Sequence, residues 1–272
     1  MGPSALFYHS LELSAKRPLT RNFSALKMPF MSKDRISSKD VRSHYDQKAG
    51  AFAAKAPTML WWEAIGKPAY KRNLSHLQRN ASRLLALDMG TASGRVPQFL
   101  RDEIGIPEKN ITGVELSSEQ LAIAKTRLPG ATLICGDASK VKLPKRKFDV
   151  VTSNMVWEFM DDDTLLKTLK NARQALKPGG TLFSITTHPD KMAIDSGLDK
   201  PGRFEIAFPW GGRGPNYYRT VGDFREIFGE AGLIIQKIEN LQVSPRFRPL
   251  DPEKFDAFQK YPYIRLAIKA QR

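Results

Sequence analysis

Two glycines follow a carboxylate in the decapeptide ALDMGTASGR at residues 86–95, and this spacing suits a ligand-binding turn. A short apolar run before Asp88 predicts a buried strand, and a helix is expected to begin just after Gly94. Gly90 and Gly94 let a ligand approach the main chain and adopt turn conformations at little steric cost. The turn alone fits a dinucleotide enzyme as well as a nucleoside-binding protein, and Ala92 stands where a central glycine is common.

Three more polar side chains end or follow expected strands. These strands are predicted at residues 111–115, 132–135 and 148–154. Glu115 closes the first of them, where a carboxylate can accept hydrogen bonds from ribose hydroxyls. Asp137 follows the next strand and Asn154 closes the last. Taken singly, Asp137 also fits an ordinary turn aspartate and Asn154 a strand cap.

The elements that position these residues alternate between strand and helix from residue 84 to residue 187. This alternation predicts a parallel sheet with right-handed crossovers. Helices are expected at 165–176 and 220–231, where apolar side chains recur at helical spacing. Segments 233–239 and 263–269 alternate as strands and are expected to pair antiparallel.

In order and spacing, five motifs resemble those of the class I S-adenosylmethionine (SAM) dependent methyltransferases, specifically the small-molecule group of ubiquinone and menaquinone methyltransferases. The motifs are LDMGTASGR, ITGVELS, CGDAS, FDVVTSNMVWEF and LKPGGTLFSITT. The resemblance covers residues 84–187 and continues more weakly to the end. It implies a Rossmann-like α/β fold with a seven-stranded, mostly parallel sheet, helices on both faces and an antiparallel last strand. It also implies an enzyme that transfers the SAM methyl group to an O, N or C atom of a small molecule by in-line displacement.

The same resemblance implies which residues contact SAM. They are Tyr45, Asp88, Gly90, Gly94, Glu115, Leu116, Asp137, Ala138, Asn154 and Met155. Glu115 would bind the ribose hydroxyls, Asp137 the adenine amino group, and Tyr45 would belong to an N-terminal segment that covers the site. Phe52 departs from the family, which often has a second tyrosine there.

The acceptor side is expected in residues 188–219, a long segment rich in glycine, proline and aromatic residues. His188 is a candidate base, since imidazole titrates near neutrality, or else a loop histidine that caps Asp190. Trp210 and Tyr218 are candidate substrate contacts. Tyr217 and Glu158 are further candidates, although Glu158 stands where the family often has histidine.

The net charge of +15 is unusual, and most of it precedes the expected catalytic domain. Residues 1–83 hold 15 Lys and Arg against 5 Asp and Glu. Three interpretations stay open: a targeting segment, a surface for nucleic acid or anionic membrane, or a solvated face. An RNA methyltransferase or RNA-binding module that uses this basic region is therefore the alternative function. No RNA-binding domain signature supports it, and nucleic acid is not the expected partner.

Composition divides the chain into three parts. Residues 1–32 are expected to form a flexible basic extension or a transit peptide, residues 33–80 a helical cap or lid, and residues 81–272 the methyltransferase domain. The expected compartment is the cytoplasm, or the mitochondrial matrix or another organelle if the extension is a transit peptide.

Several function classes lack their signatures. No apolar run approaches the length of a membrane span, and no His/Cys cluster has metal-ligand spacing, so no metal is expected. A nicotinamide oxidoreductase is disfavoured by the early Asp88 and by the missing Tyr-x-x-x-Lys pair. The single cysteine, Cys135, is expected to be a small side chain in a buried strand.

Overall fold

The computed structural model describes residues 38–55, 60–207 and 213–272, apart from the side chains of residues 38–40, 44 and 55. The basic extension at 1–32, Trp210 and the first part of the glycine-rich segment 211–214 lie outside the described residues. The expectations for a targeting segment and for Trp210 therefore stay predictions.

A seven-stranded sheet organises residues 36–272, in the strand order β3-β2-β1-β4-β5-β9-β8. Its strands are β1 (Ala86–Met89), β2 (Ile111–Glu115), β3 (Thr132–Cys135), β4 (Phe148–Asn154), β5 (Leu176–Thr187), β8 (Ile234–Leu241) and β9 (Arg265–Gln271). Strands β1 to β5 pair in parallel, and β9 runs antiparallel to both β5 and β8. The predicted Rossmann-like fold with an antiparallel last strand is confirmed.

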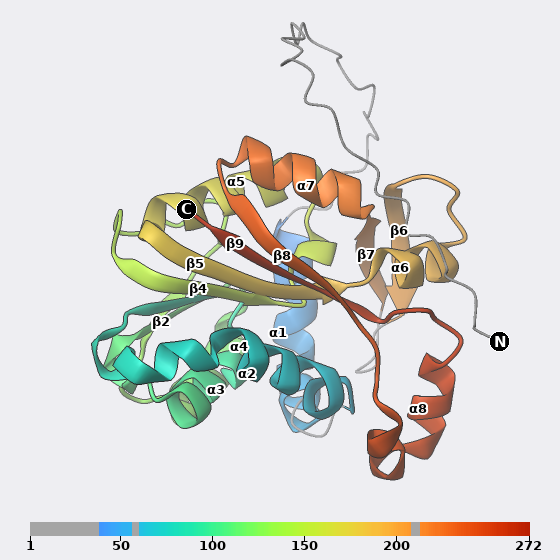
Figure 1. Cartoon of the computed structure of the whole chain (residues 1–272), viewed down its shortest axis with the longest axis horizontal. Helices are drawn as coiled ribbons and strands as arrows, with labels where there is room; N and C mark the ends of the chain where they lie inside the picture. The colour runs from blue at the N-terminus through green and yellow to red at the C-terminus, as the bar shows by residue number, and fades with distance from the viewer. Residues whose placement is uncertain (1–37, 56–59, 208–212) are drawn as a thin grey trace, which may run out of the picture. The chain divides into compact units, whose positions relative to one another are not determined.

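Helices cover both faces of the sheet (Figure 1). The helices are α1 (Ser38–Lys55), α2 (Lys67–Leu74), α3 (Arg95–Phe99), α4 (Ser118–Arg127), α5 (Asp162–Ala175), α6 (Pro189–Ser196), α7 (Val221–Glu230) and α8 (Pro252–Phe258). Successive strand residues point to opposite faces, so Ala86 packs in the core with α2 and α3 while Leu87 packs in the core with α5 and α7. Two apolar cores thus fix the sheet and the turns at its ends.

The segment expected as a long acceptor loop is more ordered than predicted. It contains α6 and a separate antiparallel hairpin of β6 (Gly202–Ala207) and β7 (Arg213–Tyr218). His188 caps α6 and Pro189 occupies its first turn, so the local sequence builds a helix start that the loop interpretation missed.

Cys135 is exposed, contrary to the prediction of a buried thiol. The reason is topological, because β3 is an edge strand and its residues are only partly covered. Among the described helices, none is long and apolar enough to cross a membrane.

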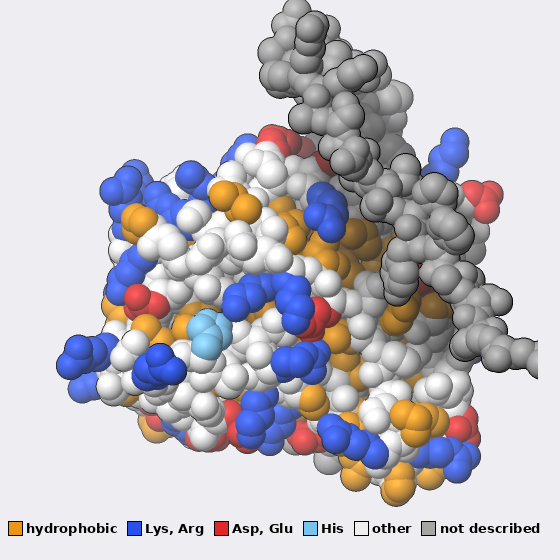
Figure 2. Space-filling model, viewed as in Figure 1, with side chains coloured by type: hydrophobic (Ala, Val, Ile, Leu, Met, Phe, Trp, Pro, Cys, Tyr) orange, Lys and Arg blue, Asp and Glu red, His pale blue; other side chains and the backbone are white. Residues whose placement is uncertain are grey.

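Charged side chains are spread over the described surface. On the face in Figure 2, Lys and Arg lie among uncharged residues and a few carboxylates, without gathering into one continuous stripe.

Candidate functional site

A cavity of about 440 Å³ opens where β1, β2, β3, β4 and β5 end at their carboxyl edges. In parallel α/β sheets, ligands bind at this edge, near the point where the strand order reverses. Here β1 lies between β2 and β4. The strand order reverses at β1, because β2 and β3 follow on one side of it and β4 and β5 on the other. The cavity therefore lies where the fold favours a ligand.

Most residues predicted to contact SAM line this cavity. They are Tyr45, Gly90, Glu115, Leu116, Asp137, Ala138, Asn154 and Met155. Asp88 and Gly94 are not among the lining residues. Asp88 is buried and accepts a hydrogen bond from the Thr152 hydroxyl at 2.7 Å, and Gly94 begins α3 with a φ of 90°. Both shape the turn, and their direct contact with a ligand stays a prediction.

The turn after β1 has a conformation that few residues adopt. Gly90 has a φ of 81°, and a Cβ atom there would lie 2.3 Å from Cγ2 of Val156. Ala92 and Met155 also have positive φ, at 46° and 57°. Non-glycine residues held at positive φ are strained and cluster at ligand sites, and both of these line the cavity.

Glu115 organises the same turn through its carboxylate. One oxygen accepts from the main-chain N–H of Ala92 and the other from that of Ser117, both at 2.8 Å. Burial raises the pKa of Glu115, and these main-chain donors oppose the rise. Burial likewise raises the pKa of Asp88 to about 7, which the Thr152 hydroxyl bond partly offsets. The carboxylate of Glu115 thus joins the turn after β1 to the start of α4.

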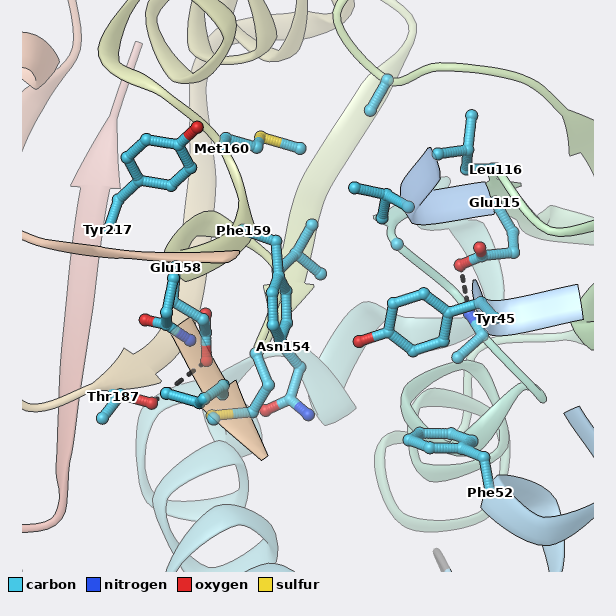
Figure 3. Close-up of a pocket in the computed structure, with 18 of the residues that line it drawn as sticks. Tyr45, Phe52, Glu115, Leu116, Asn154, Glu158, Phe159, Met160, Thr187 and Tyr217 are labelled. Atoms are coloured by element: carbon cyan, nitrogen blue, oxygen red, sulfur yellow. Dashed lines mark hydrogen bonds between the residues drawn. The ribbon is translucent and has the colours of Figure 1, made fainter. Parts of the chain in front are cut away.

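The cavity has two halves, as Figure 3 shows. Glu115 and Leu116 lie at one side, Glu158, Thr187, Met160 and Tyr217 at the other, and Tyr45 and Phe159 lie between them. The rings of Tyr45 and Phe159 meet edge to face with centroids 6.1 Å apart. Aromatic side chains therefore separate a polar half near β1 and β2 from a second half near β5 and the hairpin.

Glu158 is the carboxylate of the second half. It is buried, and it accepts hydrogen bonds from the hydroxyls of Thr186 and Thr187 at 2.9 Å and 3.1 Å. Burial raises its pKa, and the positive charge of Arg265 and the threonine bonds oppose the rise. A carboxylate in this state can accept a proton nearer to neutral pH than an exposed one.

The prediction for His188 needs correction. Its side chain is buried and is not among the lining residues; Nδ1 accepts from the main-chain N–H of Asp190 and Nε2 lies 3.0 Å from Oδ1 of Asn240. Because Nδ1 accepts a hydrogen bond, Nε2 carries the proton and donates. The capping interpretation is therefore confirmed, and both ring nitrogens are occupied by structural bonds. Tyr218 is also absent from the lining residues, whereas its neighbour Tyr217 lines the cavity.

Two lining arginines, Arg95 and Arg265, were not among the predicted site residues, and they come from segments far apart along the chain. Four residues that line the cavity have buried side-chain polar atoms without a hydrogen-bond partner in the described structure: Arg95, Asn154, Asn216 and Arg265. Buried polar atoms are normally paired, so a concentration of unpaired ones in one cavity indicates a polar ligand.

Arg219 holds the wall between the two halves. Its buried guanidinium donates to the carbonyl oxygens of Trp157 and Met160 and pairs with Asp162. These carbonyls belong to the segment that presents Glu158 and Phe159 to the cavity.

We expect Arg219→Met to lower the free energy of unfolding by about 3–6 kcal/mol, because it leaves two carbonyl groups without a donor, each worth on the order of 1.5–3 kcal/mol. Urea denaturation measures the effect, with the exposed Arg225→Met as the control on the neighbouring helix. Equal stabilities of the two variants would contradict this role for Arg219.

Known proteins resemble this chain in sequence and in fold. Residues 87–184 match the family model described as a methyltransferase domain. This segment contains the turn after β1, Glu115, Asp137 and Asn154. This segment therefore resembles the methyltransferase domain of SAM-dependent enzymes in sequence.

The relatives that this chain matches are distant. The chain is 32% identical to the demethylmenaquinone methyltransferase of Thermotoga maritima over 103 residues, which are 38% of this chain and 43% of that protein. It is 22% identical to the N-demethylindolmycin N-methyltransferase of Streptomyces griseus over 68% of this chain and 84% of that protein. The chain thus spans less than half the length of the demethylmenaquinone methyltransferases it matches.

Solved structures share the fold of this chain. A SAM-dependent methyltransferase from Mesorhizobium loti superposes with a TM-score of 0.58 at 23% identity, over 75% of this chain and 98% of that one. The [4+2]-cyclase SpnF superposes with a TM-score of 0.61 at 19% identity, over 87% of this chain and 96% of that one. At these identities the likeness shows the fold.

Proposed function

We propose that this chain transfers the methyl group of SAM to a small-molecule acceptor inside the two-halved cavity. The observation that carries the proposal is the cavity itself, where the strained turn after β1, Glu115 and Asp137 occupy one half and Glu158 the other. The printed names of the relatives, demethylmenaquinone methyltransferase and N-demethylindolmycin N-methyltransferase, support small-molecule chemistry.

The residues present in the first half suit SAM. Gly90 leaves open the space that a Cβ atom would fill. The carboxylates of Glu115 and Asp137 can accept hydrogen bonds from hydroxyl and amino groups. Oδ1 of Asn154 is buried without a hydrogen-bond partner in the described residues and can accept one from the ligand. When bound, SAM supplies an activated methyl group on a sulfonium. Tyr45 and Phe159 would close the space between cofactor and acceptor.

The chain's own contribution to the reaction would be positioning. Holding two reactants aligned in a dry site supplies on the order of 7–11 kcal/mol of barrier lowering. The edge-to-face pair of Tyr45 and Phe159, with the buried Trp157 behind it, would limit the access of water to the centre of the cavity. Glu158, rather than His188, would take the proton of an acceptor that loses one.

We expect Glu158→Gln to lower turnover by about 10²–10⁴-fold while SAM affinity stays within about twofold, because Gln keeps an acceptor for the threonine hydroxyls but cannot take a proton. In the parent, activity requires the ionised carboxylate. Since burial raises its pKa above the usual range, turnover should be present above that raised pKa and fall as the pH drops through it. A pH–rate profile of both proteins tests this.

Exposed Glu226→Gln on α7 is the matched control, expected to leave the profile unchanged. Full turnover of Glu158→Gln across the pH range would remove Glu158 from the chemistry.

The acceptor is identified by incubating the protein with methyl-labelled SAM and a metabolite extract, followed by mass spectrometry of the labelled product. A label found in one small molecule supports the proposal, and a label found in RNA would favour the RNA alternative. If SAM binds but no labelled product forms, the protein has a methyltransferase fold and does other chemistry.

A further inference from the structure

Two arginines that line the cavity have no ion-pair partner in the described residues. Arg265, at the start of β9, is 7% exposed, and Arg95, which begins α3 after the turn that follows β1, is partly buried. Nε of Arg265 and Nη2 of Arg95 are buried and have no hydrogen-bond partner in the described residues. Neither guanidinium belongs to an ion pair within 4.0 Å among these residues. A buried guanidinium with no acid bonded to it is costly to the fold, so such a pair calls for a functional explanation.

The two guanidinium groups meet at one ring. The Cζ atoms of Arg95 and Arg265 each lie 5.3 Å from the centre of Trp61, and Arg95 also lies 5.4 Å from the centre of Trp62. Trp61, Arg95 and Arg265 all line the cavity. The fold therefore brings together two cations that are 170 positions apart in the sequence.

The carboxylates nearest to these arginines are held by other groups. Glu158 accepts from two threonine hydroxyls, and Asp195 accepts from the Tyr261 hydroxyl and pairs with Lys191. For Arg95, the positive charge of Arg127 lowers the pKa and the negative charge of Glu63 raises it. Burial lowers the pKa of both Arg95 and Arg265 to about 10, which leaves them charged at neutral pH. Nη1 of Arg265 donates to the carbonyl oxygen of Ile264, whereas its Nε and the Nη2 of Arg95 keep donors without a partner in the described residues.

We propose that the acceptor carries an anionic group, a carboxylate or phosphate, which Arg95 and Arg265 bind beside Trp61. Guanidinium groups recognise such anions through paired, charge-assisted hydrogen bonds, and the apolar side chains of Phe204 and Ile206 would cover the body of the molecule. This inference rests on the proposed function, since it names the chemical class of the acceptor at that site.

The carboxylate of SAM is the other anion that these arginines could bind, so the test is done with the cofactor half already filled. The protein is saturated with S-adenosylhomocysteine and titrated with 4-phenylbutyrate, its uncharged amide 4-phenylbutyramide, and phenyl phosphate, with tryptophan fluorescence as the readout. We expect the anions to bind at least 10-fold more tightly than the amide. Arg95→Gln and Arg265→Gln should each lose that preference and keep the affinity for S-adenosylhomocysteine within threefold.

Exposed Arg79→Gln is the control variant and should behave like the parent. Equal binding of anion and amide by the parent protein overturns the inference, and this comparison needs no variant to fold. If the variants lose S-adenosylhomocysteine affinity but keep the preference for the anion, the arginines serve the cofactor and the inference is wrong. If the parent does not bind S-adenosylhomocysteine at all, the proposed function itself fails, which is a distinguishable result.

Discussion

Gly90→Val is expected to abolish SAM binding, with an affinity loss beyond 100-fold. The new Cβ would lie 2.3 Å from Val156, and a β-branched residue resists the φ of 81° that the turn requires. The turn would therefore have to move into the space that the ligand needs. Equilibrium dialysis with labelled SAM measures the loss.

Gly179→Val is the control variant, because it introduces the same backbone strain at a position outside the cavity. Gly179 has a similar positive φ of 74°, but a Cβ there meets nothing within 4 Å, and this glycine does not line the cavity. It should lose stability, on the order of 1–3 kcal/mol, and bind SAM normally. If Gly90→Val binds SAM as the Gly179 variant does, the turn after β1 does not form the site.

Glu115→Ala is the second variant with a large expected effect, a loss of about 5–150-fold in SAM affinity. Removal of the carboxylate leaves ligand hydroxyls without a buried partner, at a cost of on the order of 1–3 kcal/mol. It also removes the acceptor of the main-chain N–H groups of Ala92 and Ser117, so the melting temperature should fall. Calorimetric titration and thermal denaturation together measure both effects.

Exposed Glu119→Ala on α4 is the control for Glu115, with affinity and stability expected near those of the parent. A folded Glu115→Ala protein that binds SAM as tightly as the parent would contradict the cofactor assignment.

The sheet and its polar edge were predictable because they depend on local patterns. Each strand before Glu115, Asp137 and Asn154 is a short apolar run, and parallel pairing brings their carboxyl ends to one edge. The two strands predicted at the end of the chain pair antiparallel, as expected. The same locality explains why the first half of the cavity could be predicted.

The second half depends on long-range packing. Arg265 reaches the cavity because β9 inserts between β5 and β8, and no local pattern places it beside Arg95. His188 illustrates the opposite error, since a histidine after a strand suggested chemistry although its neighbours Pro189 and Asp190 form a helix start. Burial of these side chains, which decides their roles, is a property of the folded chain.

The most direct test of the central claim is a parallel binding titration of the full chain with SAM, NAD and tRNA. The cavity predicts one SAM molecule per chain, bound in competition with S-adenosylhomocysteine and undisturbed by NAD or tRNA. Absence of SAM binding by the folded protein, or displacement of SAM by NAD, would contradict the account.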